Sequence, residues 1–376
     1  MTSRERLRAA LNHKEPDRVP IDLGGIVTGI TKVAHKNVRD LLGIEGREII
    51  IDMIQQLVKP EEELLRRFGV DTRYVFLTGS RDHDVKDFEM PEYVDEWGVR
   101  RRRAELHTGG AYYDIVESPF TRFTLEDLKK HNWPDPYVEG RFRDLGVEAK
   151  RLHDETEYAV MVNAIGSVFE FSWYTRGFEQ FLMDLVLDPD PVCYLMDRML
   201  EFQMGLFDQI LDAAGDYVDV VMVGDDIANQ NGPTISPELY RKHIKPRQRK
   251  LYDLIKSKTG AKLFYHSCGG IRDFIGDLID MGVDVINPIQ VAAAGMDTGA
   301  LKKEFGRDLS FWGGVDTQSV LPFGTPADVK AEVRRRIDDL APGGGYVFNS
   351  VHNIQSDVPP ENVAAMFEAA LEYGSY

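Results

Sequence analysis

The sequence contains little cysteine and no long apolar run. Its two cysteines, Cys193 and Cys268, cannot supply the disulfide framework of a small secreted protein, and so low a count is typical of a reducing compartment. No stretch approaches the roughly 20 uncharged apolar residues that a membrane-spanning helix needs, and the charged start of the chain is unlike a signal peptide. We therefore expect a cytoplasmic protein that does not span a membrane.

Positive charge is also in deficit. The chain has 45 lysine and arginine residues against 62 aspartate and glutamate residues, which gives a formal net charge of −17. Such an excess of negative charge disfavours a nucleic-acid backbone as partner. One run of arginines, residues 100–103, lies in a strand-like stretch, and we interpret it as a solvated strand face.

Short apolar runs alternate with amphipathic helical segments along the chain, a pattern that is typical of parallel β/α units. Seven such runs are evident and an eighth strand is unassigned, so we predict an α/β fold, a (β/α)₈ TIM barrel, as a single domain over residues 1–376. An open doubly wound sheet is the alternative, but no Gly-x-Gly-x-x-Gly motif follows the first run. The predicted strands are residues 71–76, 158–162, 218–223, 262–265, 283–286, 309–312 and 346–348.

Two segments depart from this alternation. Residues 1–69 are predicted to form an N-terminal extension of helices and a loop, and residues 88–120 to form antiparallel strands inserted after the first barrel strand. Helix starts are marked by capping patterns, such as Thr325 with Asp328. The prolines within 188–191 predict a break between two helices.

Polar residues follow nearly every predicted strand. In a barrel of this kind the carboxyl ends of the strands meet at one rim, where catalytic residues gather. Each residue by itself is typical of a cap or a turn, but their recurrence at one rim favours a functional site. We predict that Asn163 and Asn349 orient a substrate there. The polar residues at the strand ends are Asn163, Asp225, Asp226, His266, Cys268, Asn287, Gln290, Asp316, Asn349 and His352.

His266 and Cys268 are the most informative pair in the chain. Side chains two residues apart on a strand end point in the same direction, and imidazole with thiolate is a common zinc pair. His352, which follows another strand by a few residues, is the predicted third ligand, and Asp226 is either a fourth ligand or an acid. One thiolate with two imidazoles favours polarisation of an oxygen over activation of a thiol. The alternative is an ordinary buried thiol beside a hydrogen-bonded imidazole.

Several motifs together resemble the uroporphyrinogen decarboxylase superfamily, and the likeness spans essentially the whole chain. Members of that superfamily are (β/α)₈ barrels, which agrees with the strand pattern. The motifs are Arg-Glu-Arg-Leu-Arg-Ala-Ala-Leu-Asn at 4–12, Pro-Asp-Arg-Val-Pro at 16–20, Asp225-Asp226, Gln-Asn-Gly-Pro at 230–233, Ser-Pro-Glu-Leu-Tyr at 236–240, His-Ser-Cys-Gly-Gly at 266–270 and Phe-Trp-Gly-Gly-Val-Asp at 311–316.

The chain is most similar to the zinc-dependent, corrinoid-linked methyltransferases of that superfamily. The decarboxylases carry an arginine-rich segment near the start that holds the substrate's carboxylates, whereas residues 21–27 here contain an aspartate among glycines and aliphatics. The thiol-alkylating methyltransferases have cysteine at the third ligand position, where this chain has His352. The resemblance therefore fits better the relatives that take methyl groups from ethers.

From the ligand set and this resemblance we predict a zinc-dependent methyltransferase. It would move a methyl group from a small methoxylated substrate, plausibly an aromatic ether, to the corrinoid of a separate corrinoid protein, with Zn²⁺ stabilising the leaving oxygen. Three alternatives stay open in this order: a methylcorrinoid:thiol methyltransferase, a metal-free decarboxylase, and a binding protein with a closed structural zinc.

Overall fold

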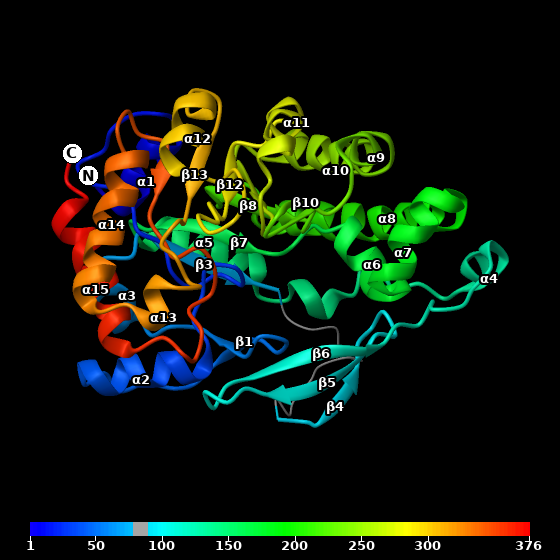
Figure 1. The fold of residues 1–376 in the computed structure, drawn as a ribbon, viewed down its shortest axis with the longest axis horizontal. Coiled ribbons are helices and arrows are strands. Elements are labelled where there is room, and N and C mark those ends of the chain that lie inside the picture. The colour runs from blue at the N-terminus through cyan, green and yellow to red at the C-terminus, as the bar shows by residue number, and fades with distance from the viewer. Residues whose placement is uncertain (78–88) are drawn as a thin grey trace.

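The computed structural model describes residues 1–77 and 89–376, and its centre is one curled parallel sheet (Figure 1). Within that part of the chain the sheet has seven strands in the order β14-β13-β12-β11-β8-β7-β3. The arrangement confirms the predicted TIM-barrel-like α/β fold, with strand ends shifted by one or two residues. The strands are β3 (Thr72–Phe76), β7 (Ala159–Asn163), β8 (Val220–Gly224), β11 (Lys262–His266), β12 (Val285–Asn287), β13 (Ser310–Trp312) and β14 (Tyr346–Val347).

A short segment of the N-terminal extension closes the ring between the two outer strands. On one side, the Phe348 amide donates to the Pro20 carbonyl at 2.8 Å and the Asp22 amide donates to the Phe348 carbonyl at 3.0 Å. On the other side, the Asp71 amide donates to the Ile21 carbonyl at 2.8 Å. This segment therefore takes the place of the unassigned eighth strand, although the sequence pattern assigned it to the extension.

Strand side chains divide strictly by parity between two apolar layers. The barrel interior holds Tyr74, Met161, Met222, Phe264 and Val285, while their strand neighbours pack in the larger cluster beneath the helices. Because side chains alternate along a strand, the residue two positions beyond an interior residue also points inward. The side chains of Asn163, His266 and Asn287, each two positions beyond an interior residue, are therefore aimed at the barrel axis.

Helices surround the curled sheet, with breaks and starts where local signals predicted them (Figure 1). Thr325 forms the predicted capping box with Asp328, and a helix ends at Leu187 just before the proline-containing break. The helices of this layer are α5 (Leu145–Glu155), α6 (Phe169–Arg176), α7 (Phe178–Leu187), α8 (Pro189–Ala214), α9 (Pro237–Leu239), α10 (Lys245–Lys258), α11 (Ile275–Asp280), α12 (Thr298–Phe305), α13 (Val320–Phe323), α14 (Pro326–Leu340) and α15 (Pro360–Tyr373).

The N-terminal extension is helical, as predicted, but it also contains a hairpin, and no helix in the described residues is long and apolar enough to cross a membrane. A further pair of very short strands, β9 (Ala228–Asn229) and β10 (Gly232–Pro233), forms a turn beyond β8. The elements outside the barrel proper are α1 (Ser3–Leu11), α2 (Lys32–Leu42), β1 (Ile50–Asp52), β2 (Leu57–Val58), α3 (Glu62–Arg67) and α4 (Leu125–Lys130).

The predicted insertion after the first barrel strand is an antiparallel sheet of β4 (Glu92–Val94), β5 (Arg100–Glu105) and β6 (Ala111–Glu117). Residue 88, where the prediction began, lies outside the described residues. The interpretation of the arginine run as a solvated face needs a correction. Arg100 and Arg102 are exposed, but Arg101 is only 5% exposed, because alternation along the strand turns it toward the barrel.

Asp71, fully buried before β3, ties the extension to the barrel. Its carboxylate accepts hydrogen bonds from Arg6 Nη1 at 2.7 Å and from Arg18 Nη1 at 2.8 Å, and from the Ile21 amide at 2.8 Å. Both arginines belong to the opening motifs of the sequence. Those motifs therefore have a structural role, because they hold the closing segment against the first barrel strand.

We expect Asp71→Asn to lower the free energy of unfolding by about 3 kcal/mol, because it removes the buried carboxylate that Arg6 and Arg18 share. Urea unfolding followed by circular dichroism measures the change. Asp40→Asn is the matched control: Asp40 pairs with Lys36 at 2.6 Å on the exposed face of α2, and its loss should leave stability essentially unchanged. Equal stability of the Asp71 variant and the control would contradict the anchoring role.

Candidate metal centre and active-site cavity

His266 and Cys268 lie together at the carboxyl end of β11. His266 has the parity of Phe264 and therefore points into the barrel, and Cys268 Sγ lies 3.6 Å from His266 Nε2. The chain turns sharply at Gly269, whose φ is +91°. A Cβ at this glycine would lie 2.6 Å from the Asn229 amide nitrogen, so a larger residue would disturb the turn that presents the thiol.

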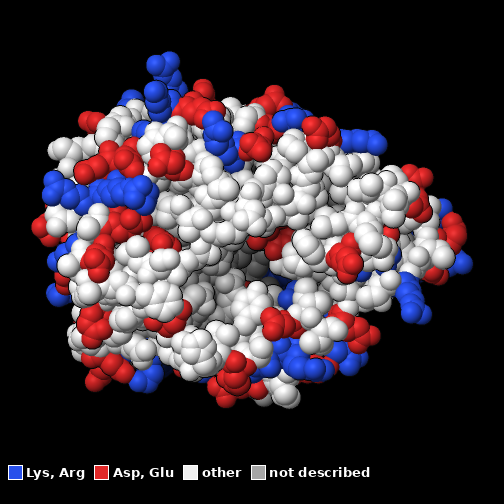
Figure 2. Space-filling model, in the orientation of Figure 1, with Lys and Arg blue, Asp and Glu red and all other residues white. Residues whose placement is uncertain are grey.

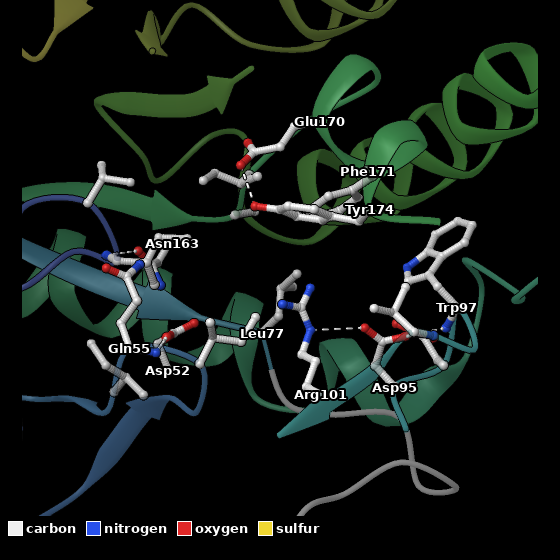
Figure 3. A pocket seen from close by; sticks show the side chains of 18 of the residues that line it. Asp52, Gln55, Leu77, Asp95, Trp97, Arg101, Asn163, Glu170, Phe171 and Tyr174 are labelled. Atoms are coloured by element: carbon white, nitrogen blue, oxygen red, sulfur yellow. Dashed lines mark hydrogen bonds and ion pairs between the residues drawn. The ribbon is translucent and has the colours of Figure 1, made fainter. Parts of the chain in front are cut away.

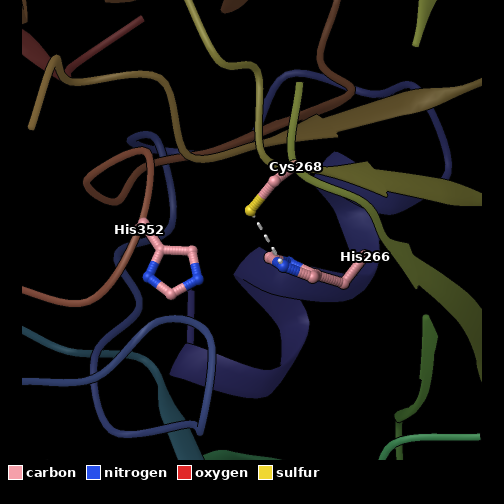
Figure 4. A group of neighbouring side chains, drawn as sticks. All are labelled: His266, Cys268 and His352. Carbon is pink, nitrogen blue, oxygen red and sulfur yellow. Dashed lines mark hydrogen bonds between the residues drawn. The ribbon is translucent and has the colours of Figure 1, made fainter. Parts of the chain in front are cut away.

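His352 reaches the same point from the loop after β14. Its ring centroid lies 5.5 Å from that of His266, and the ligand atoms of His266, Cys268 and His352 all lie within 4.8 Å of one another (Figure 4). In a tetrahedral zinc site, ligand atoms about 2.0–2.3 Å from the ion are separated by about 3.3–3.8 Å. Small side-chain adjustments would thus bring these three atoms around one ion.

Asn287, at the end of β12, fixes the orientation of the His266 ring. The Asn287 Nδ2 group donates to the Trp312 carbonyl at 3.2 Å, which turns its Oδ1 toward His266. His266 Nδ1 donates to that oxygen at 2.6 Å. With Nδ1 carrying the proton, the lone pair of Nε2 faces the thiol and His352. Such an outer partner is the usual support of a metal-binding imidazole.

The electrostatic surroundings suit a cation at this point. Burial lowers the pKa of His266 to about 4, and burial together with His266 lowers the pKa of His352 to about 4, so both rings are neutral near pH 7. Burial, with Asp226 and Glu170 nearby, raises the pKa of Cys268 well above its ordinary value. A bound divalent cation would reverse that effect and stabilise the thiolate.

Asp226 lies beside this group, at the end of the strand that neighbours β11. Its Oδ1 accepts from the Cys268 amide at 2.8 Å and lies 4.0 Å from His266 Nε2. Burial raises the pKa of its carboxyl group. The preceding Asp225 has a different role: it is turned away and accepts the Glu170 amide and the Gln248 side chain at 2.9 Å each, which supports the start of α6.

His266, His352 and Asp226 open into a cavity of about 930 Å³ between the barrel mouth and the inserted sheet. Figure 2 shows the hollow in the middle of this face. A cavity of this size accommodates a small organic molecule with room to spare. Aromatic side chains supply much of its wall, with polar groups at separate points (Figure 3). The aromatic wall includes Phe76, Tyr93, Trp97, Phe171, Tyr174 and Phe202.

The two asparagines predicted to bind substrate have different surroundings. Asn163 lines the cavity, where its Oδ1 accepts from the Ile26 amide at 2.9 Å and leaves its Nδ2 available. Asn349 is fully buried below the rim and does not line the cavity. Its Nδ2 donates to Asp22 at 3.3 Å and to the Thr28 carbonyl at 3.2 Å, so its amide is occupied within the barrel core. We therefore correct the prediction for Asn349: this side chain has a structural role and does not bind substrate.

Sequence reasoning missed Glu170 and Arg101, both of which line the cavity. Glu170 hydrogen-bonds Tyr174, and burial together with Asp226 raises the pKa of its carboxyl well above the ordinary value. Glu170 comes from α6 and not directly from a strand end, so the rim pattern could not single it out. For Arg101, the alternation within the arginine run was an available signal.

Comparisons with known proteins agree with the fold and with the family resemblance of the sequence motifs. A family profile described as Uroporphyrinogen decarboxylase (URO-D) matches residues 112–373. The chain is 24% identical over 277 residues to uroporphyrinogen decarboxylase of Methylococcus capsulatus, covering 70% of this chain and 75% of that protein. It is also 24% identical over 282 residues to uroporphyrinogen decarboxylase of Pseudomonas fluorescens, covering 70% and 73% respectively.

A solved structure shares the fold over its full length. A methyltransferase from Methanosarcina mazei superposes with a TM-score of 0.69, covers 99% of both chains and is 17% identical in sequence. At that identity, the likeness is informative about the fold alone.

The Asn287–His266 hydrogen bond leads to a testable expectation about zinc binding. Asn287→Leu should weaken zinc binding about 10- to 100-fold, because the His266 ring loses the acceptor that orients it. Competition with a chromophoric chelator measures the affinity. Asn287→Asp keeps an acceptor at the same place and should bind zinc within about tenfold of the unaltered protein.

Asn231→Leu is the matched control for this experiment, because Asn231 is an exposed asparagine in the turn beyond β8. Its substitution should leave zinc affinity unchanged. If Asn287→Leu bound zinc as tightly as this control, the orienting role of Asn287 would be refuted.

Proposed function

The chain belongs to the uroporphyrinogen decarboxylase family, and from the side chains at its barrel mouth we propose that it is a zinc-dependent methyltransferase. The substrate is a small methoxylated compound of the aromatic methyl ether class, and the acceptor is the corrinoid of a separate corrinoid protein. The observation that carries the proposal is the convergence of His266, Cys268 and His352 beside a cavity of about 930 Å³.

The donor set fits zinc. A thiolate and two neutral imidazoles are ligands that zinc prefers, and three protein ligands leave a fourth position for substrate. With a single thiolate, a bound zinc ion would keep a net positive charge and would supply Lewis acidity that stabilises negative charge on a leaving oxygen. Two features support a cation at this point. His266 Nε2 faces Cys268 and His352, and acidic side chains lie around Cys268.

The other residues of the cavity position the ether substrate and supply the proton that the leaving oxygen takes. The aromatic wall of the cavity excludes water and packs against an aromatic ring, and Asn163 Nδ2 orients a polar substituent. The carboxyl group of Asp226, whose pKa is raised by burial, lies beside the site and would supply the proton to the departing oxygen. We keep a direct contact of Asp226 with the ion as the second role open to this side chain.

The proposed reaction is a displacement of oxygen at the methyl carbon. The bond between methyl carbon and oxygen breaks, and its electron pair stays on the oxygen, which takes the proton. The new bond to the methyl carbon forms with an electron pair of cobalt in the reduced corrinoid, which is a substrate carried by the partner protein. The cavity contributes by holding the methyl carbon in line between the two groups.

The described cavity offers too few cations for a substrate with many carboxylates. It is lined by Arg101 and Arg141, and Arg141 is already paired with Glu96. The segment Ile21–Val27, where decarboxylases of the family carry arginines according to the resemblance, contributes none here. The lining of the cavity therefore disfavours decarboxylation of a porphyrinogen. A thiol acceptor is disfavoured by the single thiolate, because a more electron-rich ligand set suits a bound thiol better.

Removal of one ligand tests the proposal. Cys268→Ser should lower the zinc content of the purified protein from about one ion per chain to below about one tenth, and His352→Ala should do the same. Transfer of methyl groups from aryl methyl ethers to a reduced corrinoid protein should fall by at least about 100-fold in both variants. Elemental analysis and the methyl-transfer assay provide the two measurements.

Cys193→Ser is the matched control, because Cys193 is the other cysteine of the chain and lies beside His243 on the outer helices. It should retain both zinc and activity. Full methyl-transfer activity of Cys268→Ser would contradict the proposed function. A zinc ion held by four protein donors, measured by X-ray absorption, would instead identify a closed structural site.

A further inference from the structure

Arg101 is a buried cation in the wall of the cavity. It lies on β5 in register with Tyr93 on β4 and Ile115 on β6, with its side chain on the face of the inserted sheet that turns toward the barrel. The adjacent Arg102 is on the other face, and its side chain is 63% exposed. An arginine is rarely buried at 5% exposure unless it is paired, so the partner of Arg101 needs an explanation.

The partners of Arg101 within the protein account for one edge of its guanidinium group. Its Nε lies 3.4 Å from Asp95 Oδ2, a long contact, and its Cζ lies 5.0 Å from the centre of the Tyr174 ring. Nη1 and Nη2 have no hydrogen-bond partner among the residues that the structure describes. Figure 3 shows the guanidinium group projecting into the cavity toward Tyr174 and Phe171, with Asp95 to one side.

The acidic side chains near Arg101 either have hydrogen-bond partners of their own or have raised pKa values, which disfavour their charged form. Asp95 Oδ1 accepts the amides of Trp97 and Val99 at 3.0 Å each, so this carboxylate belongs to its own turn. Burial raises the pKa of Asp95, of Asp52 and, well above its ordinary value, of Glu170, while the charge of Arg101 opposes each shift. The second arginine of the cavity, Arg141, is paired with Glu96.

We propose that the free Nη1 and Nη2 groups of Arg101 bind a carboxylate of the substrate. A planar guanidinium group binds a carboxylate through two parallel hydrogen bonds, and the end formed by the two Nη atoms is the one left open here. Tyr174, whose ring lies beside the guanidinium group, and Asp95, at its Nε, keep that end turned toward the cavity. Arg101 is thus a specificity-determining residue on the inserted sheet.

This site narrows the substrate class and rests on the proposed function for the identity of the opposite end. A methoxylated aromatic acid would place its carboxylate at Arg101, its ring against the aromatic wall, and its methoxy group toward His266, Cys268 and His352. Because Arg101 is only 5% exposed, the pairing of a carboxylate with it should discriminate strongly against a neutral analogue, which would leave the guanidinium group unpaired.

Binding of two matched ligands tests the inference without methyl transfer. The probes are 3-methoxybenzoate and its neutral isostere 3-methoxybenzamide, titrated calorimetrically into the purified full-length protein. The unaltered protein should bind the acid about 10- to 100-fold more tightly than the amide. Arg101→Met should abolish this preference by weakening the acid alone. Arg102→Met, on the exposed face of the same strand, should keep the preference intact.

Two results would overturn the inference. One is equal affinity of the unaltered protein for acid and amide. The other is that Arg101→Met and Arg101→Lys weaken both ligands to the same extent, which would mark a purely structural role. The proposed function fails separately: if the acid is preferred through Arg101 but neither ligand is demethylated by the zinc-loaded protein with a reduced corrinoid protein, the carboxylate site stands and the proposed reaction does not.

Discussion

Closure of the ring by a three-residue segment is the constraint on which the rest of the structure depends. Residues 20–22 bond to Phe348 on one side and to Asp71 on the other, so the loop after β14 stays at the barrel mouth. Asp22 strengthens the closure from inside, where Tyr74 and Trp312 donate to its carboxylate at 3.0 Å. The closure, together with the bond from the Val351 amide to the Val315 carbonyl at 2.8 Å, holds His352 opposite the end of β11.

The polar network beneath the rim explains why Asn349, although it follows a strand, is not at the site. Asp22 and Asn349 bond one another within the barrel, and burial raises the pKa of Asp22. Their donors and acceptors are used in joining the closing segment to β3, β13 and the loop after β14. A buried polar group must be hydrogen-bonded, and this requirement decides that these two side chains support the rim.

The two ends of the cavity favour ligands of opposite charge. At the barrel end, neutral imidazoles, a thiol and a carboxyl group gather where a divalent cation would compensate their desolvation. At the sheet end, Arg101 is a cation with open hydrogen-bonding capacity. The aromatic wall between them lowers the local dielectric and strengthens any charge placed at either end. A substrate that carries an oxygen for the cation and an anion for the arginine would satisfy both.

Much of this could be predicted from sequence because it depends on local order. The strand runs, the capping of α14, the break before α8 and the direction of His266 and Cys268 all follow from spacing along the chain. Contacts between distant segments could not be predicted in this way. The closing role of residues 20–22, the internal role of Asn349 and the position of Glu170 depend on which segments the ring brings together. Local periodicity determined the helices and strands and which side chains point inward. Only tertiary packing decided which of those side chains are hydrogen-bonded within the protein and which remain free for a ligand.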